Sequence, residues 1–145
     1  MKQLRERRAL LWLPGLILLS GCGGPEANCD SPETRNSVIK VISSDSHNAL
    51  VEYAAKNSNA VESTANSAST EAAKSETREK ASQSASYRLD DQIVTNSKSK
   101  DKRSVTCSGT LYATVGDTTA QKKVDFKVEQ TPDGGLSVTV SPFKF

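Results

Sequence analysis

Histidine and cysteine, the side chains best suited to acid–base and nucleophilic catalysis near neutral pH, are scarce in this 145-residue chain, which holds one histidine and three cysteines. His47 follows Asp45 and Ser46, so the stretch DSH contains the three residue types of a hydrolase triad. Neighbours in sequence seldom face one another in the geometry that a triad needs. We therefore expect a solvated histidine, no catalytic residue and a protein that is not an enzyme.

The sequence gives equally little support for a metal or cofactor site. With a single histidine and two cysteines that are expected to pair, only scattered carboxylates remain as ligands. Asp90 and Asp91 could bind a cation or act as paired acids, but neighbouring residues of a strand point to opposite faces of a sheet. The sequence contains no glycine-rich phosphate loop. We predict no metal and no cofactor.

Cys22 lies where an apolar segment gives way to a polar chain. Residues 1–8 are basic, residues 9–19 (ALLWLPGLILL) are mostly apolar, and two small residues precede the cysteine. This is the layout of a secretory signal peptide. The apolar run is shorter than the roughly 20 residues that a membrane-spanning helix needs. We therefore predict an export signal over residues 1–21.

The stretch LLSGC, which ends at Cys22, resembles the lipobox of bacterial lipoproteins. In that family the thiol is joined to a diacylglyceryl group, signal peptidase II cuts before the cysteine, and the new amine is acylated, often with palmitate. The resemblance implies cleavage between Gly21 and Cys22 and a membrane partner held through lipid. Gly23, which is not aspartate, implies the outer membrane of a Gram-negative cell, on the side that faces the periplasm.

Lipid on Cys22 would leave Cys29 and Cys107 as an even pair, and an oxidising compartment favours a disulfide between them. The alternative is an ordinary secreted protein or an uncleaved anchor, which leaves one thiol over. Two separate free thiols at Cys29 and Cys107 remain the other possibility for the pair.

The amino-terminal half must supply the helices. Residues 22–28 form the predicted lipidated tether, and the segment GGPEAN after Cys22 spans at most about 20 Å. Residues 29–56 predict a helical part that begins at a serine N-cap with a following proline and is broken or kinked near residues 43–45, or consists of two short helices.

Residues 57–86 are rich in Ser and Ala with one larger aliphatic, Val61. They predict a low-complexity insertion, either a solvated helix or disordered, that serves as a spacer, a partner-binding helix or a tolerated surface insertion.

Residues 87–145 predict an antiparallel meander of four strands. Apolar and polar residues alternate over 105–115, 124–128 and 136–140, and a weaker strand over 87–95 leads into the polar loop NSKSKDK. One apolar sheet face needs a cover, and the amino-terminal helix is the amphipathic candidate. The fold class is therefore α+β. A Cys29–Cys107 disulfide would fix the helix start to the sheet, and the chain-entropy model values its loop of roughly 80 residues at about 4 kcal/mol.

The charge pattern argues against nucleic-acid binding. Four basic residues and one acid lie in residues 1–21, so the formal charge of +2 for the whole chain leaves −1 for residues 22–145. The densest cluster could contact anionic headgroups or an acidic partner; it comprises Lys98, Lys100, Lys102 and Arg103.

The mature chain is similar to small uncharacterised periplasmic lipoproteins, on the basis of Cys29, the CSGTL stretch that begins at Cys107, and the terminal hairpin. We expect a non-catalytic binding or scaffold module that is anchored in the cell envelope and holds an envelope protein. The alternative is an inhibitor or exclusion lipoprotein that blocks an enzyme or a transfer apparatus through the protruding loop NSKSKDK.

Overall fold

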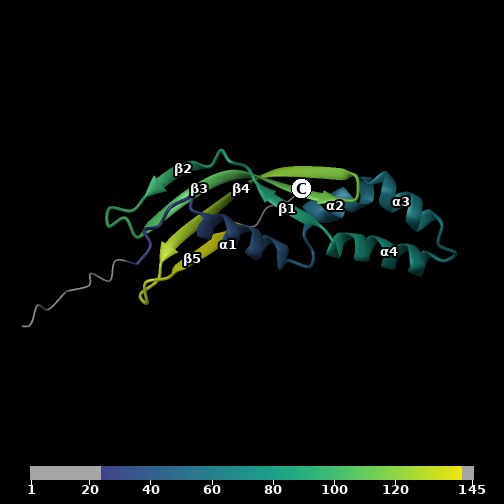
Figure 1. Ribbon diagram of the computed structural model, residues 1–145, viewed down its shortest axis with the longest axis horizontal. Helices are drawn as coiled ribbons and strands as arrows, with labels where there is room; N and C mark the ends of the chain where they lie inside the picture. Colours follow the sequence, from purple (N-terminus) through teal and green to yellow (C-terminus); the bar gives the residue numbers. More distant parts are fainter. Residues whose placement is uncertain (1–23, 142–145) are drawn as a thin grey trace, which may run out of the picture.

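Helices form the first part of the described chain and strands the second, in a computed structural model that describes residues 24–141 (Figure 1). The helices are α1 (Pro32–Ser43), α2 (Ala49–Asn57), α3 (Asn59–Asn66) and α4 (Glu71–Gln83). The strands are β1 (Ser86–Leu89), β2 (Val94–Lys98), β3 (Ser104–Val115), β4 (Thr118–Gln130) and β5 (Leu136–Val140). The predicted α+β class is confirmed, whereas the predicted signal peptide and Cys22 lie outside the described residues.

Side-chain caps determine where the first two helices begin. Ser31 Oγ accepts a hydrogen bond from Thr34 N at 3.1 Å, and Pro32 occupies the first turn of α1. Asn48 is buried and caps α2, because its Oδ1 accepts from Leu50 N at 3.0 Å while its amide donates to Ile42 O at 3.3 Å. The predicted break is therefore confirmed, and one asparagine joins the end of α1 to the start of α2.

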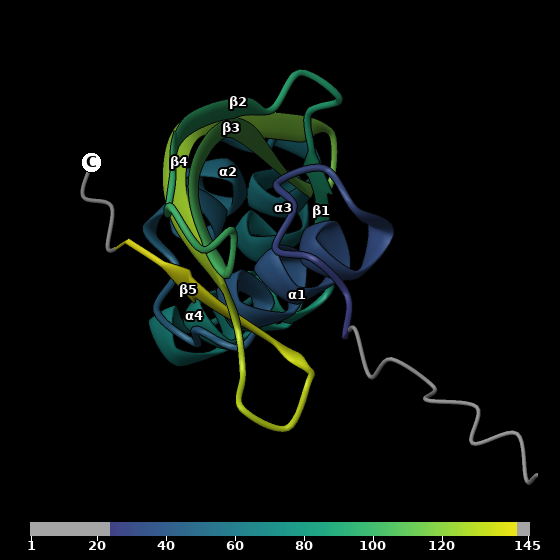
Figure 2. The same cartoon turned by 90° about the vertical axis from the view of Figure 1, so that its left-hand side faces the viewer.

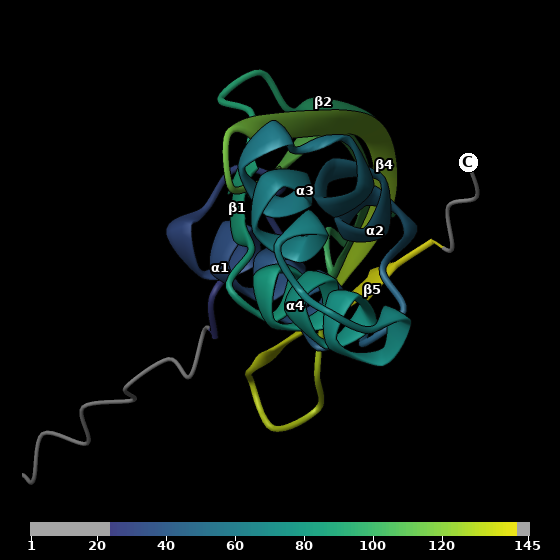
Figure 3. The same cartoon turned by 90° about the vertical axis from the view of Figure 1, so that its right-hand side faces the viewer.

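Residues 57–86 are mostly helical. Ser58 caps α3, which buries Val61 and Ala65. No residue of α4 is buried, so α4 is the solvated helix that the composition allowed. This part of the chain forms a helical end that Figure 3 shows facing the viewer.

The sheet is antiparallel in the order β1-β3-β4-β5, and β2 also pairs with β3. The prediction of one strand over 87–95 is wrong, because β1 pairs with the second half of β3 and β2 with the first half. The NSKSKDK loop is also shorter than predicted, since β2 continues to Lys98. Between β1 and β2, the chain turns at Asp90 and Asp91.

Arg35 on α1 holds the break between β1 and β2. Its guanidinium donates to the carbonyl oxygens of Leu89, Asp90 and Asp91 at 3.4, 3.2 and 3.2 Å. It also pairs with the carboxylates of Asp30 at 2.6 Å and Asp91 at 3.3 Å. A helix cation thus satisfies the backbone carbonyls that a continuous strand would have paired.

The sheet curls around the first two helices (Figure 2). Helix α1 contacts both β1 and β5, the first and last strands of the sheet order, and α2 covers β3 and β4. The largest fully buried side chains come from both layers and include Phe126, Leu50, Leu111 and Val38. The predicted helical cover of the sheet is confirmed, with two helices in place of one.

Candidate functional site

The described chain begins at the end of the molecule formed by two hairpins. Figures 1 and 2 show the first described residues beside the β2–β3 hairpin and the β4–β5 turn, opposite the helical end. Gly24 lies so close to Gly134 in the β4–β5 turn that a Cβ on Gly24 would overlap the Gly134 carbonyl oxygen. We call this region the hairpin end.

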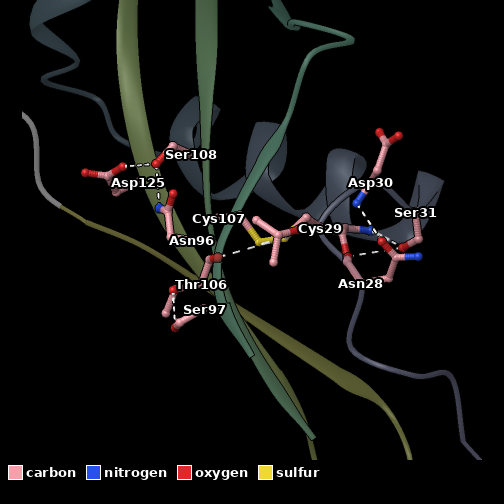
Figure 4. The surroundings of a disulfide bond; sticks show 12 residues. Asn28, Cys29, Asp30, Ser31, Asn96, Ser97, Thr106, Cys107, Ser108 and Asp125 are labelled. Carbon is pink, nitrogen blue, oxygen red and sulfur yellow. Dashed lines mark hydrogen bonds between the residues drawn. A yellow bond between two sulfur atoms is a disulfide. The ribbon is translucent and has the colours of Figure 1, made fainter. Parts of the chain in front are cut away.

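A disulfide joins Cys29 to Cys107, as predicted (Figure 4). Their Cα atoms lie 5.8 Å apart across a sequence separation of 78 residues, and both side chains are buried. The Thr95 hydroxyl donates a hydrogen bond to Cys29 Sγ at 3.2 Å. The bond fixes the segment before α1 to the middle of the sheet, and Cys22 is the remaining cysteine of the chain.

The segment predicted as a tether is attached to the domain where it is described. Ala27 is fully buried, and the carbonyl oxygen of Asn28 accepts from the Thr34 hydroxyl at 2.7 Å. Glu26 pairs with Lys98 Nζ at 2.9 Å, and this hydrogen bond lowers the pKa of Glu26. The packed segment from Gly24 onward leaves a shorter tether than the sequence suggested.

The predicted basic cluster lies on one hairpin. Lys98 ends β2 and is engaged by Glu26, whereas Lys100, Lys102 and Arg103 lie in the exposed tip, residues 99–103. Within residues 24–141, none of the three tip cations forms an ion pair. The structure therefore brings the cluster together but divides it into one paired and three unpaired cations.

Asp101 interrupts this cluster in sequence but is bonded within the tip. Its Oδ1 accepts from the Ser99 hydroxyl at 2.5 Å and from Arg103 N at 3.2 Å, and the Ser99 bond is the main cause of its lowered pKa. Ser99 Oγ in turn accepts from Ser104 N at 2.9 Å. These bonds make the tip a short, structured turn.

His47 lies in the exposed connection between α1 and α2. Asp45 Oδ1 accepts from the backbone N of His47 at 3.0 Å, and Ser46 Oγ lies 3.0 Å from His47 Nδ1. The carboxylate thus bonds the backbone of His47, whereas a triad requires it to orient the ring.

Asp90 and Asp91 do not form an acid pair on a strand. Asp90 Oδ1 accepts from Asp91 N at 2.7 Å, and Asp91 faces Arg35. In the part of the chain that the structure describes, no group of three or more His, Cys, Asp or Glu side chains could hold a metal ion.

The helical end has a cleft of about 830 Å³. No sequence pattern indicated this cleft. It is lined by residues that include His47, Glu52, Lys56, Glu62 and Arg78. Arg78 on α4 donates to both carboxylate oxygens of Glu62 on α3, at 2.7 and 2.9 Å, and thereby lowers the pKa of Glu62. No local sequence pattern predicts the Arg78–Glu62 ion pair, because the two residues lie on separate helices.

No helix within residues 24–141 is long and apolar enough to cross a membrane. Comparison with protein-family models, with curated proteins and with solved structures finds no match to this chain.

Proposed function

We propose that this protein is a lipid-anchored, non-catalytic binding or scaffold module of the cell envelope, held in the membrane by acyl chains on Cys22. The observation that carries the proposal is the Cys29–Cys107 disulfide, because it occupies the other two cysteines of the chain. Cys22 follows an export-type segment, and two or three acyl chains are enough for stable anchoring.

The packing of the described amino-terminal segment supports the same proposal. Cys22 is two residues before Gly24, and consecutive Cα atoms are 3.8 Å apart, so the anchor lies within about 8 Å of Gly24. Gly24 itself lies against the β4–β5 turn. The domain would therefore stand directly on the membrane. We propose the periplasmic face of the outer membrane as its location because the residue after Cys22 is Gly23 and not aspartate.

The cleft at the helical end is the surface we propose for an envelope protein partner. It is concave, and its lining includes residues of both charges, among them Glu52, Glu79 and Lys56. Such a lining suits a polar, mixed-charge segment of a protein. Helices α3 and α4, which carry part of its lining, lie opposite the end where the described chain begins (Figures 1 and 3).

The inhibitor or exclusion alternative would act through the protruding loop NSKSKDK. The hairpin tip spans only residues 99–103 and is held by its own hydrogen bonds. No observation favours this second function over the first.

The test is metabolic labelling of the full chain in bacterial cells with a palmitate analogue, followed by mass spectrometry of the amino-terminal peptide. We expect a diacylglyceryl and acyl group on Cys22 and loss of label in Cys22→Ser. The double variant Cys29→Ser/Cys107→Ser is the matched control and should keep the label. An unmodified Cys22 peptide from membranes would refute the anchor.

The partner is tested by cross-linking in the same cells. A photoactivatable residue at Glu52 in the cleft should capture one specific envelope protein, whereas the same residue at Lys123 on β4 should not. Equal, unspecific capture from both positions would argue against a binding module.

A further inference from the structure

We propose that the β2–β3 hairpin tip, residues 99–103, rests on anionic lipid headgroups and thereby orients the domain with its helical end away from the membrane. This inference depends on the proposed anchor at Cys22 and adds a second, electrostatic contact with a defined orientation. The surface consists of Lys100, Lys102 and Arg103.

The first support is the place where the chain enters the domain. Gly24 is in backbone contact with Gly134 of the β4–β5 turn, and Glu26 pairs with Lys98 at the base of the tip, with 2.9 Å between Nζ and Oε1. Residues 24–26 are thus attached to both hairpins. An anchor within about 8 Å of Gly24 brings the hairpin end, and not the helical end, to the bilayer.

The second support is the state of the charges on the tip. Lys100, Lys102 and Arg103 are exposed, and none forms an ion pair with another described residue. The carboxylate of Asp101 accepts hydrogen bonds from Ser99 and Arg103 N, and Glu26 pairs with Lys98. These two carboxylates also attract Arg103 and Lys102 at longer range, which leaves the tip with an excess of positive charge. Attraction to an anionic surface decays over about 10 Å at 0.1 M salt. A short tether keeps the tip close enough to the membrane for this attraction to act.

The third support is the backbone at Lys102. Its φ of 59° lies in the left-handed region, where it is the one described residue other than glycine with a positive φ. Glycine or asparagine is favoured in that conformation, so a lysine there is held against the local preference. Non-glycine residues in this conformation often lie at functional sites, and here the residue is a cation in an exposed tip, which suits contact with anionic headgroups.

The experiment places a single tryptophan reporter at each end of the lipidated full chain. Residues 22–145 contain no tryptophan, because the one in the chain is Trp12. Pro132→Trp reports on the β4–β5 turn and Ala72→Trp on α4, and both positions are exposed. The proteins are reconstituted in vesicles of brominated phosphatidylethanolamine with either phosphatidylglycerol or phosphatidylcholine.

We expect the brominated lipid to quench the reporter at 132 and not the one at 72, most strongly with phosphatidylglycerol. The triple variant Lys100→Gln/Lys102→Gln/Arg103→Gln should lose the extra quenching that phosphatidylglycerol causes, as should high salt. The matched control removes three exposed lysines elsewhere that line neither the tip nor the cleft, Lys40→Gln/Lys80→Gln/Lys123→Gln, and should keep it.

Equal quenching at both reporters, or an unchanged response in the triple tip variant, would overturn the inference. Quenching at 132 that ignores lipid charge, together with cross-links from the tip to an acidic protein, would overturn it in favour of a protein partner. Mass spectrometry of the same samples separates the two proposals. Lipid on Cys22 with the wrong orientation refutes this inference alone, whereas absence of lipid refutes the proposed function.

Discussion

Gly116 is the position where the identity of one residue most directly determines how the sheet meets the helices. It has a φ of +57° in the β3–β4 turn, and a Cβ there would overlap Ser58 Oγ. Ser58 is fully buried, donates to Asp117 Oδ1 at 2.6 Å and accepts from Val61 N at 3.3 Å as the cap of α3. The turn and the start of α3 therefore share one buried hydroxyl.

We expect Gly116→Ala to lower the free energy of unfolding by about 2 to 4 kcal/mol. About 1 kcal/mol comes from the left-handed backbone, and the rest from displacing the buried Ser58 hydroxyl. Gly134→Ala is the matched control, because Gly134 has a φ of +85° but its Cβ would meet only ordinary contact at 3.9 Å. Urea unfolding should show a loss of only about 1 kcal/mol for the control. Equal losses in both variants would remove the role assigned to Ser58.

Asp117 should make part of the stability depend on pH. Hydrogen bonds from the Ser58 hydroxyl and from Ala60 N lower its pKa below the ordinary value of 3.8. A carboxyl whose pKa is lower in the folded state stabilises the fold above its unfolded pKa, and this contribution is lost as the pH falls through the folded pKa. The wild type should therefore lose more stability than Asp117→Asn between about pH 6 and pH 2. Urea midpoints of both proteins at each pH measure the difference, and parallel pH profiles would contradict the assignment.

At the scale of elements, the sequence predicted what depends on local periodicity and capping. The alternation over 105–115 marked β3, and Ser31 marked the start of α1. The sequence analysis did not predict the split between β1 and β2. One signal was present, because Asp91 is the next residue after Tyr87 and Leu89 on the same face of a strand, where an apolar residue would be expected. The Arg35 hydrogen bonds that hold this split join residues 54 to 56 positions apart in the sequence. No local sequence pattern can predict such contacts.

Helix α4 should be the least stable helix of the domain. It buries no residue, and Arg78 links it to Glu62 on α3. A helix with no fully buried side chain, whose Ala81 is only partly buried against the core, opens locally at low cost. We expect Arg78→Ala to speed amide hydrogen exchange throughout α4 while leaving exchange in β3 and β4 unchanged. Glu79→Ala, an exposed change on the same helix, should have a smaller effect. Uniform acceleration over the whole domain would show that α4 unfolds only with the rest.

At the scale of the whole molecule, one covalent link holds the hairpin end together. The sheet curls around α1, and α1 is preceded by the segment that carries Cys29 (Figure 2). Gly24, Glu26 and Ala27 all lie within five residues before that cysteine, so the disulfide to Cys107 restricts where they can lie against the hairpins. The same bond therefore supports both the fold and the proposed membrane-facing surface.

We expect Cys29→Ala/Cys107→Ala to lower the free energy of unfolding by about 3 to 4 kcal/mol, because the bond closes a long loop in the unfolded chain. This is a large share of the stability of a small domain, which is typically about 5 to 15 kcal/mol. Urea unfolding with and without reductant measures the loss. Reductant should bring the wild type to the stability of the double variant and leave the double variant unchanged.

Limited proteolysis adds a readout that separates the two roles of the bond. Loss of the disulfide should free residues 24–30 for cleavage under native conditions, while β3 and β4 resist cleavage until global unfolding. A double variant in which residues 24–30 still resist cleavage would mean that the contacts of Gly24 and Glu26 hold the segment without the bond. In that case the membrane-facing surface would persist in a reducing compartment, and its orientation would no longer depend on an oxidising envelope.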